Sequence, residues 1–123
     1  REQGAIVSVA HPFDTRRGGW QRQDLDAIAP MLDAVEVFNS RTLIRKFNNL
    51  ARDFAYEHHL TGTAGSDGHT ARELGRAYTT LPGFNSPDEL KLALKSSVPS
   101  GKTSGVNVMF SSTAARLYKR LRS

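Results

Sequence analysis

Short apolar runs alternate along this chain with segments of helical periodicity. Residues 5–10 form one apolar run, residues 34–38 a second, and residues 61–66 a weaker third, each of strand length. Apolar residues recur at helical spacing in residues 23–33, where proline is expected to shorten or distort the helix, and in residues 43–54. This alternation predicts an α/β fold with parallel strands, open or barrel-like.

The second half of the chain is expected to contain further elements of both kinds. Ser86 and Pro87 predict the start of a helix that runs to about Lys95, because serine caps a first turn and proline fits the first helical position. Residues 96–105 are rich in serine and glycine and are expected to form a mobile loop. The remaining expected elements are a short helix at 70–74, strands at 77–81 and 106–110, and a basic terminal helix at 111–121.

Length, charge and the absence of cysteine limit the size of the domain and the ligands that it could bind. The 123 residues suit one domain or part of one, and 38% hydrophobic residues are enough for a modest core. The net charge of +5 favours anionic substrates and permits nucleic acid. Cysteine is absent, which excludes disulfides and thiolate chemistry, so a bound metal would have to be held by His, Asp or Glu.

The layout of the chain also bears on its location. No apolar run approaches the roughly 18 residues that span a bilayer, so we expect a soluble, cytoplasmic protein that does not bind a membrane. The first apolar run begins after residue 4, without an initiator methionine. We therefore interpret the chain as part of a longer protein.

Asp67-Gly68-His69 is the sharpest local motif. Residues two apart in extended backbone project to the same side, and Gly68 allows a close approach of the backbone to a ligand. A carboxylate and an imidazole would then converge. Alternatively, Asp67 caps a short helix and His69 is an ordinary surface histidine.

His11 and Glu36 are the next candidates. Pro12 ends the first strand directly after His11, so this histidine would meet Asp67 and His69 at one edge of a parallel sheet. Two histidines and a carboxylate suit zinc, manganese or ferrous iron. Glu36 alternates with the valines of its strand and could be a general base or a ligand, although pairing with an arginine would explain it equally well.

Several polar residues could contact a substrate. Asn39 and Arg41 follow the second strand, where an amide and a guanidinium could hold substrate oxygens, or serve as turn former and surface residue. The loop 14–23, with Trp20 as its expected anchor, carries Arg16, Arg17 and Arg22, which could bind phosphate or single-stranded nucleic acid or remain solvated. The adjacent His58 and His59 end a helix and are not expected to carry chemistry.

Three ordered motifs resemble the later motifs of the polymerase and histidinol phosphatase (PHP) superfamily of metal-dependent phosphoesterases. They are Ala10-His11-Pro12-Phe13, Val35-Glu36-Val37-Phe38-Asn39-Ser40-Arg41, and Ala64-Gly65-Ser66-Asp67-Gly68-His69, the last followed by Glu73-Leu74-Gly75. The resemblance covers residues 4–94.

The resemblance implies a distorted barrel of seven strand–helix units, (β/α)7, with metal ions at the carboxyl ends of the strands. It implies that His11, Asp67 and His69 are metal ligands with catalytic roles. Asn39 and Arg41 would position the substrate, and we add Arg16 as a further substrate-binding candidate. Glu36 is not usually a ligand in this family and is kept as an additional candidate.

The chain departs from the family pattern in lacking its opening His-x-His motif and the histidines and glutamate of its first half. We therefore interpret residues 1–95 as the C-terminal portion of a PHP domain, and residues 96–123 as a loop with a basic C-terminal helix. The isolated chain is expected to be inactive. Removal of half a barrel would expose strand edges, so we also expect self-association.

The expected function is hydrolysis of a phosphate ester by a hydroxide activated on Zn, Mn or Fe ions. The substrate would be a small phosphomonoester, a nucleotide or a nucleic-acid end. The alternative is a non-catalytic PHP-derived module that binds nucleic acid or a partner protein.

Overall fold

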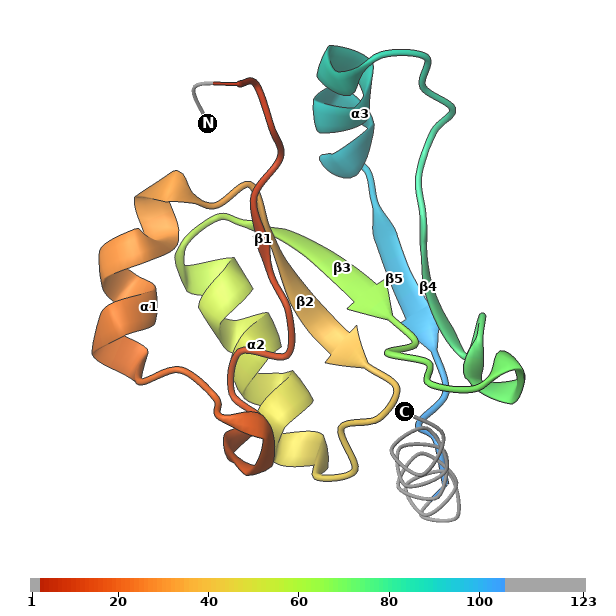
Figure 1. Ribbon diagram of the computed structural model, residues 1–123. Helices are drawn as coiled ribbons and strands as arrows, with labels where there is room; N and C mark the ends of the chain where they lie inside the picture. Colours follow the sequence, from red (N-terminus) through yellow and green to blue (C-terminus); the bar gives the residue numbers. More distant parts are fainter. Residues whose placement is uncertain (1–2, 106–123) are drawn as a thin grey trace, which may run out of the picture.

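The computed structural model describes residues 3–105, which form a parallel sheet, two covering helices and an antiparallel ribbon (Figure 1). The parallel sheet has three strands in the order β1-β2-β3. Their bounds are Ser8–Val9 for β1, Ala34–Asn39 for β2 and Thr61–Gly65 for β3. The predicted α/β class and the parallel pairing of the first strands are therefore confirmed.

Helices α1, Arg22–Ile28, and α2, Arg45–Glu57, cover one face of this sheet (Figure 1). The 3-10 turn η2, Ala29–Met31, follows α1 directly, so the helix ends where Pro30 was expected to shorten it. A hydrophobic core lies between sheet and helices, with Val35 and Val37 from β2 packed against Leu25 and Phe54. Glu36 alternates with these valines and points away from the core, as expected.

β1 is shorter and more exposed than the sequence indicated. The apolar run 5–10 was expected to be a buried strand, but it pairs only through Ser8–Val9, and Val9 is its one buried residue. β1 forms an edge of the sheet, which leaves one side of the strand without a neighbour among residues 3–105. The expected role of Trp20 as a loop anchor is also wrong, because its side chain is 47% exposed.

The last described part of the chain forms a separate two-stranded antiparallel ribbon. β4, Ala77–Thr80, pairs with β5, Val98–Gly101, and the Thr79 hydroxyl joins the ribbon to β3 by accepting a hydrogen bond from Ala64 N at 2.8 Å. The prediction of a loop at 96–105 is therefore wrong for residues 98–101, which form β5. Helix α3, Pro87–Leu94, connects the two strands and begins at the predicted Ser86 cap.

Two short 3-10 turns complete the described elements, η1 at Thr15–Arg17 and η3 at Ala71–Glu73. Residues 3–105 form an open sheet, and barrel closure is not seen among them. The strand expected at 106–110 and the helix expected at 111–121 lie outside the described residues. No described helix is long and apolar enough to cross a membrane.

Candidate active site at the carboxyl ends of the parallel strands

The candidate site residues follow the carboxyl ends of β1, β2 and β3. His11 comes two residues after β1, Asn39 is the last residue of β2, and Asp67 comes two residues after β3. Because the three strands are parallel, their carboxyl ends lie together along one edge of the sheet (Figure 1). This edge runs across the three strand ends and is distinct from the lateral edge formed by β1. The expected placement of these residues at strand ends is therefore observed.

Glu36 lies at the centre of this edge. Its Oε2 accepts hydrogen bonds from the backbone N–H of His11 at 2.7 Å and from Asn39 Nδ2 at 2.9 Å. Burial raises the pKa of Glu36 above its ordinary value, although these two hydrogen bonds favour the ionised form. The carboxylate packs over Gly65 of β3, where a Cβ atom would collide with Oε1.

Asn39 connects Glu36 with Asp67. Its Nδ2 also lies 3.3 Å from Asp67 Oδ2, while its Oδ1 accepts the backbone N–H of Arg41 at 2.9 Å. The side chain is only 1% exposed, so its orientation is set by these contacts and by the packing around them. The carboxylate of Glu36 in β2 and that of Asp67 in the loop after β3 are thus brought to one amide.

Arg17 is one of the three loop arginines that the sequence offered together, and its contact with this edge was not predicted. Its guanidinium contacts Asp67 Oδ2, Asn39 Oδ1 at 3.3 Å and Thr42 Oγ1 at 3.1 Å, while its Nε donates to Asp14 Oδ2 at 3.0 Å. Burial opposes ionisation of Asp14, but the charges of Arg17 and Arg16 outweigh it and hold the pKa of Asp14 below its ordinary value. Nothing in the local sequence distinguishes Arg17 from Arg16.

Arg16 and Arg41, predicted to bind substrate, have protein partners. Arg16 Nε lies 3.4 Å from Asp14 Oδ1. Arg41 is 8% exposed, and its Nη1 lies 2.6 Å from Glu73 Oε1, which makes a buried ion pair. Their roles in substrate binding stay predictions.

The same Glu73 supports the segment around His69. Its Oε2 accepts the backbone N–H of His69 at 3.0 Å and the Thr70 hydroxyl at 2.9 Å. Burial alone would raise its pKa, but these hydrogen bonds and the charge of Arg41 hold the pKa of Glu73 below its ordinary value. One buried carboxylate therefore links the loop after β2 to the loop after β3.

Two of the predicted metal ligands have unusual backbone conformations. His11 has a φ of 32° and Asp67 a φ of 49°, in the left-handed region that residues other than glycine rarely adopt. Such conformations persist only where the surrounding structure holds them, and they cluster at functional sites. The His69 ring lies beside Asp67, with Nδ1 2.9 Å from the carbonyl oxygen of Asp67.

The donor types of this edge fit a divalent metal, but their arrangement does not complete a metal site. Among residues 3–105, no three His, Asp or Glu side chains are grouped so that they could hold a metal ion. The Asp67 carboxylate is instead paired with the Arg17 guanidinium. The metal-ligand roles of His11, Asp67 and His69, and of Glu36 as an additional ligand, stay predictions.

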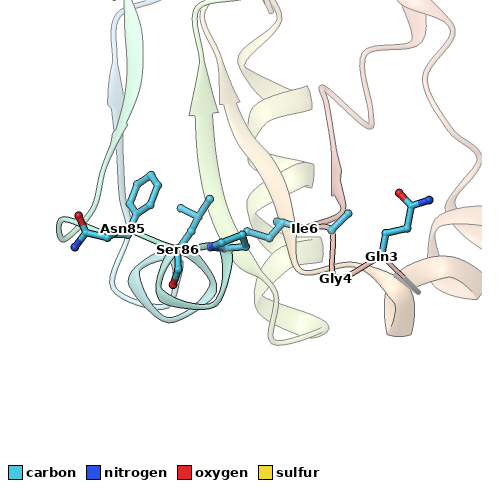
Figure 2. A pocket seen from close by; sticks show the side chains of 9 residues that line it. Gln3, Gly4, Ile6, Asn85 and Ser86 are labelled. Carbon is cyan, nitrogen blue, oxygen red and sulfur yellow. The ribbon is translucent and has the colours of Figure 1, made fainter.

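An apolar pocket lies away from this edge, beside the segment that precedes β1. Figure 2 shows it between Gln3, Gly4 and Ile6 on one side and Asn85 and Ser86, just before α3, on the other. Its lining contains no His, Asp or Glu. This pocket therefore offers no acid–base or metal-ligating group.

The comparisons with known proteins found one matching family model and one similar curated protein. The model of a family described as PHP-associated matches residues 45–98, a range that includes Asp67 and His69. An uncharacterized protein of Methanocaldococcus jannaschii is 33% identical over 96 residues, which cover 73% of this chain and 40% of that protein. No solved structure matches the chain significantly.

The predicted resemblance to the C-terminal portion of PHP proteins is therefore confirmed over residues 45–98. The chain spans 40% of the length of the curated relative that it matches.

Proposed function

We propose that the protein containing this chain hydrolyses a phosphate ester with the help of divalent metal ions, and that the chain contributes His11, Asp67 and His69 to the site. One observation carries the proposal. Side chains that follow three parallel strands converge at one sheet edge, where Asn39 joins the carboxylates of Glu36 and Asp67. The family match supports a PHP-related protein.

In this proposal the metal is zinc, manganese or iron, and residues beyond 3–105 supply the missing ligands. When bound, such ions would stabilise negative charge on phosphoryl oxygens and lower the pKa of water. Asn39 and Arg17 would orient oxygens of the substrate. Glu36, whose pKa burial raises, would be suited to hold and release a proton.

The substrate class in this proposal is a phosphorylated small molecule, a nucleotide or a nucleic-acid end. The net charge of +5 favours each of these anions over neutral substrates.

The alternative function is a non-catalytic module that binds nucleic acid or a partner protein. The pairing of Asp67 with Arg17, in place of a group of metal ligands among the described residues, is the observation that favours it. The salt dependence of binding tests the nucleic-acid form of this alternative, because the affinity for nucleic acid falls steeply as the salt concentration rises.

The test is phosphatase activity of the natural protein that contains this chain, measured with p-nitrophenyl phosphate and Mn²⁺ or Zn²⁺. Asp67→Asn and His11→Ala should each lower kcat/KM at least about 100-fold, as expected when a group that stabilises transition-state charge is removed. Asp53→Asn, on the exposed side of α2, is the matched control and should leave the activity unchanged. Full activity in both site variants would contradict the proposal.

A further inference from the structure

The chain has a polar pocket outside the candidate active site. A pocket of about 750 Å³ lies between the first turns of α2, the end of β2 and the residues that follow β5. Figure 1 shows these three parts at the same end of the molecule. None of the predicted site residues lines this pocket.

The lining of this pocket is basic. Arg45 and Arg52 come from α2, Lys102 follows β5, and the lining contains no aspartate or glutamate. The three cationic side chains belong to exposed residues. In the part of the chain that the structure describes, neither Arg45 nor Lys102 forms an ion pair, and Arg52 makes a weak contact with Asn49 Oδ1 at 3.5 Å.

The charges of this pocket are therefore not balanced by the residues that line it. Cationic side chains around one concavity focus a positive potential, which raises the local concentration of anions. Guanidinium groups present donors that match the geometry of phosphate oxygens. The amide of Asn49 adds a donor. The N-cap residue of α2, Ile44, makes no side-chain capping bond, so the positive end of the helix adds to the same field.

We propose that this pocket binds a phosphate group, either of a small molecule or of a nucleic-acid backbone. The three cations from two separate segments supply the charge, and Phe38 and Leu43 supply an apolar wall. The inference does not rest on the proposed function, because the pocket would bind phosphate whether or not the edge at Asp67 is catalytic.

The pocket shares a structural support with the candidate active site. Asn48 lines the pocket, and its side-chain Oδ1 accepts the backbone N–H of Asn39 at 3.1 Å. On the other side, the Ser40 hydroxyl donates to the carbonyl oxygen of Lys102 at 2.8 Å. Asn48 therefore contacts both the pocket and Asn39 of the candidate active site. Ser40, the residue after Asn39, likewise contacts Lys102 of the pocket.

The test is a titration of the full chain with inorganic phosphate, followed residue by residue through backbone amide NMR shifts. Saturable shifts are expected at Arg45, Asn49 and Lys102. The double variant Arg45→Gln/Lys102→Gln should weaken this binding at least tenfold. The control Lys46→Gln/Lys95→Gln removes the same two charges from exposed residues that do not line the pocket, and it should change the affinity less than twofold.

A second titration uses a short single-stranded oligonucleotide to separate the two sources of phosphate. Tighter binding than inorganic phosphate, with a steep salt dependence and the same residues shifted, would assign the pocket to a nucleic-acid backbone. Equal or weaker binding would assign it to a small phosphorylated molecule.

Two results would overturn the inference. One is the absence of saturable shifts at the pocket residues. The other is an equal loss of affinity in Lys46→Gln/Lys95→Gln and in Arg45→Gln/Lys102→Gln, which would mean that only the overall charge matters. Asp67→Asn should leave phosphate binding at the pocket unchanged, so a failure of the proposed catalytic function would not be mistaken for a failure of this site.

Discussion

Gly65 is the residue that gives the Glu36 carboxylate its place at the sheet edge. A side chain at this position would collide with Glu36 Oε1. We predict that Gly65→Ala displaces Glu36, breaks its hydrogen bonds to His11 N and Asn39 Nδ2, and lowers the free energy of unfolding by about 1–3 kcal/mol. Urea denaturation measures the stability, and the amide shift of His11 reports the lost hydrogen bond.

The control for this substitution is Gly83→Ala. A Cβ atom at Gly83 would meet nothing within 4 Å, and its φ is not positive. The expected change in unfolding free energy is within about 0.5 kcal/mol. Equal effects of the two substitutions would contradict the steric role assigned to Gly65.

At the same scale, the sequence predicted which residues stand at the strand ends but not what they contact. His11, Asn39 and Asp67 follow recognisable strands, so their common edge could be predicted. The contact of Arg17 with Asp67 could not be predicted, because the two residues are 50 positions apart in the sequence. A local sequence pattern cannot predict which distant residue a loop side chain will contact.

At the scale of elements, the buried pair Arg41–Glu73 connects the loop after β2 to η3. Glu73 is fully buried and accepts hydrogen bonds from Arg41, His69 N and Thr70. We predict that Glu73→Ala lowers the free energy of unfolding by about 3–5 kcal/mol, because it leaves these buried donors without their acceptor. Thermal and urea denaturation measure the loss.

The matched control is Glu57→Ala. Glu57 pairs with Arg22 on the surface, and both side chains are about half exposed. Water screens such a pair, so the expected loss is at most about 1 kcal/mol. A loss for Glu73→Ala as small as that of the control would show that the buried pair does not hold the two loops together.

The strands differ in how well they could be predicted. β2 and β3 follow apolar or β-branched runs, and their pattern was enough to place them. β5 contains Val98-Pro99-Ser100-Gly101, a segment with a single large apolar residue, and was expected to be a loop. Its strand conformation comes from pairing with β4, where Gly101 is required because a Cβ atom would lie 2.6 Å from Ala77 Cβ.

At the scale of the whole molecule, β1 is an edge strand among residues 3–105, and the side that no described strand pairs with offers backbone groups to a second chain. We predict that the chain self-associates with increasing concentration, as measured by light scattering. Ile6→Lys, which places a charge beside this edge, should shift the chain toward monomer. Leu92→Lys, at a 64% exposed apolar residue of α3, is the control and should have little effect. A clean monomer at all concentrations would contradict the prediction.

The sequence by itself determined the alternation of strands and helices, the parallel pairing of the first strands, and the polar residues at their carboxyl ends, because periodicity and chain-breaking residues act locally. Only the tertiary structure decided that Asn39 joins Glu36 to Asp67, that Arg17 neutralises Asp67, and that β4 leaves the parallel sheet to pair with β5. Those outcomes depend on strand register and on the packing of distant loops, which are properties of the folded chain as a whole.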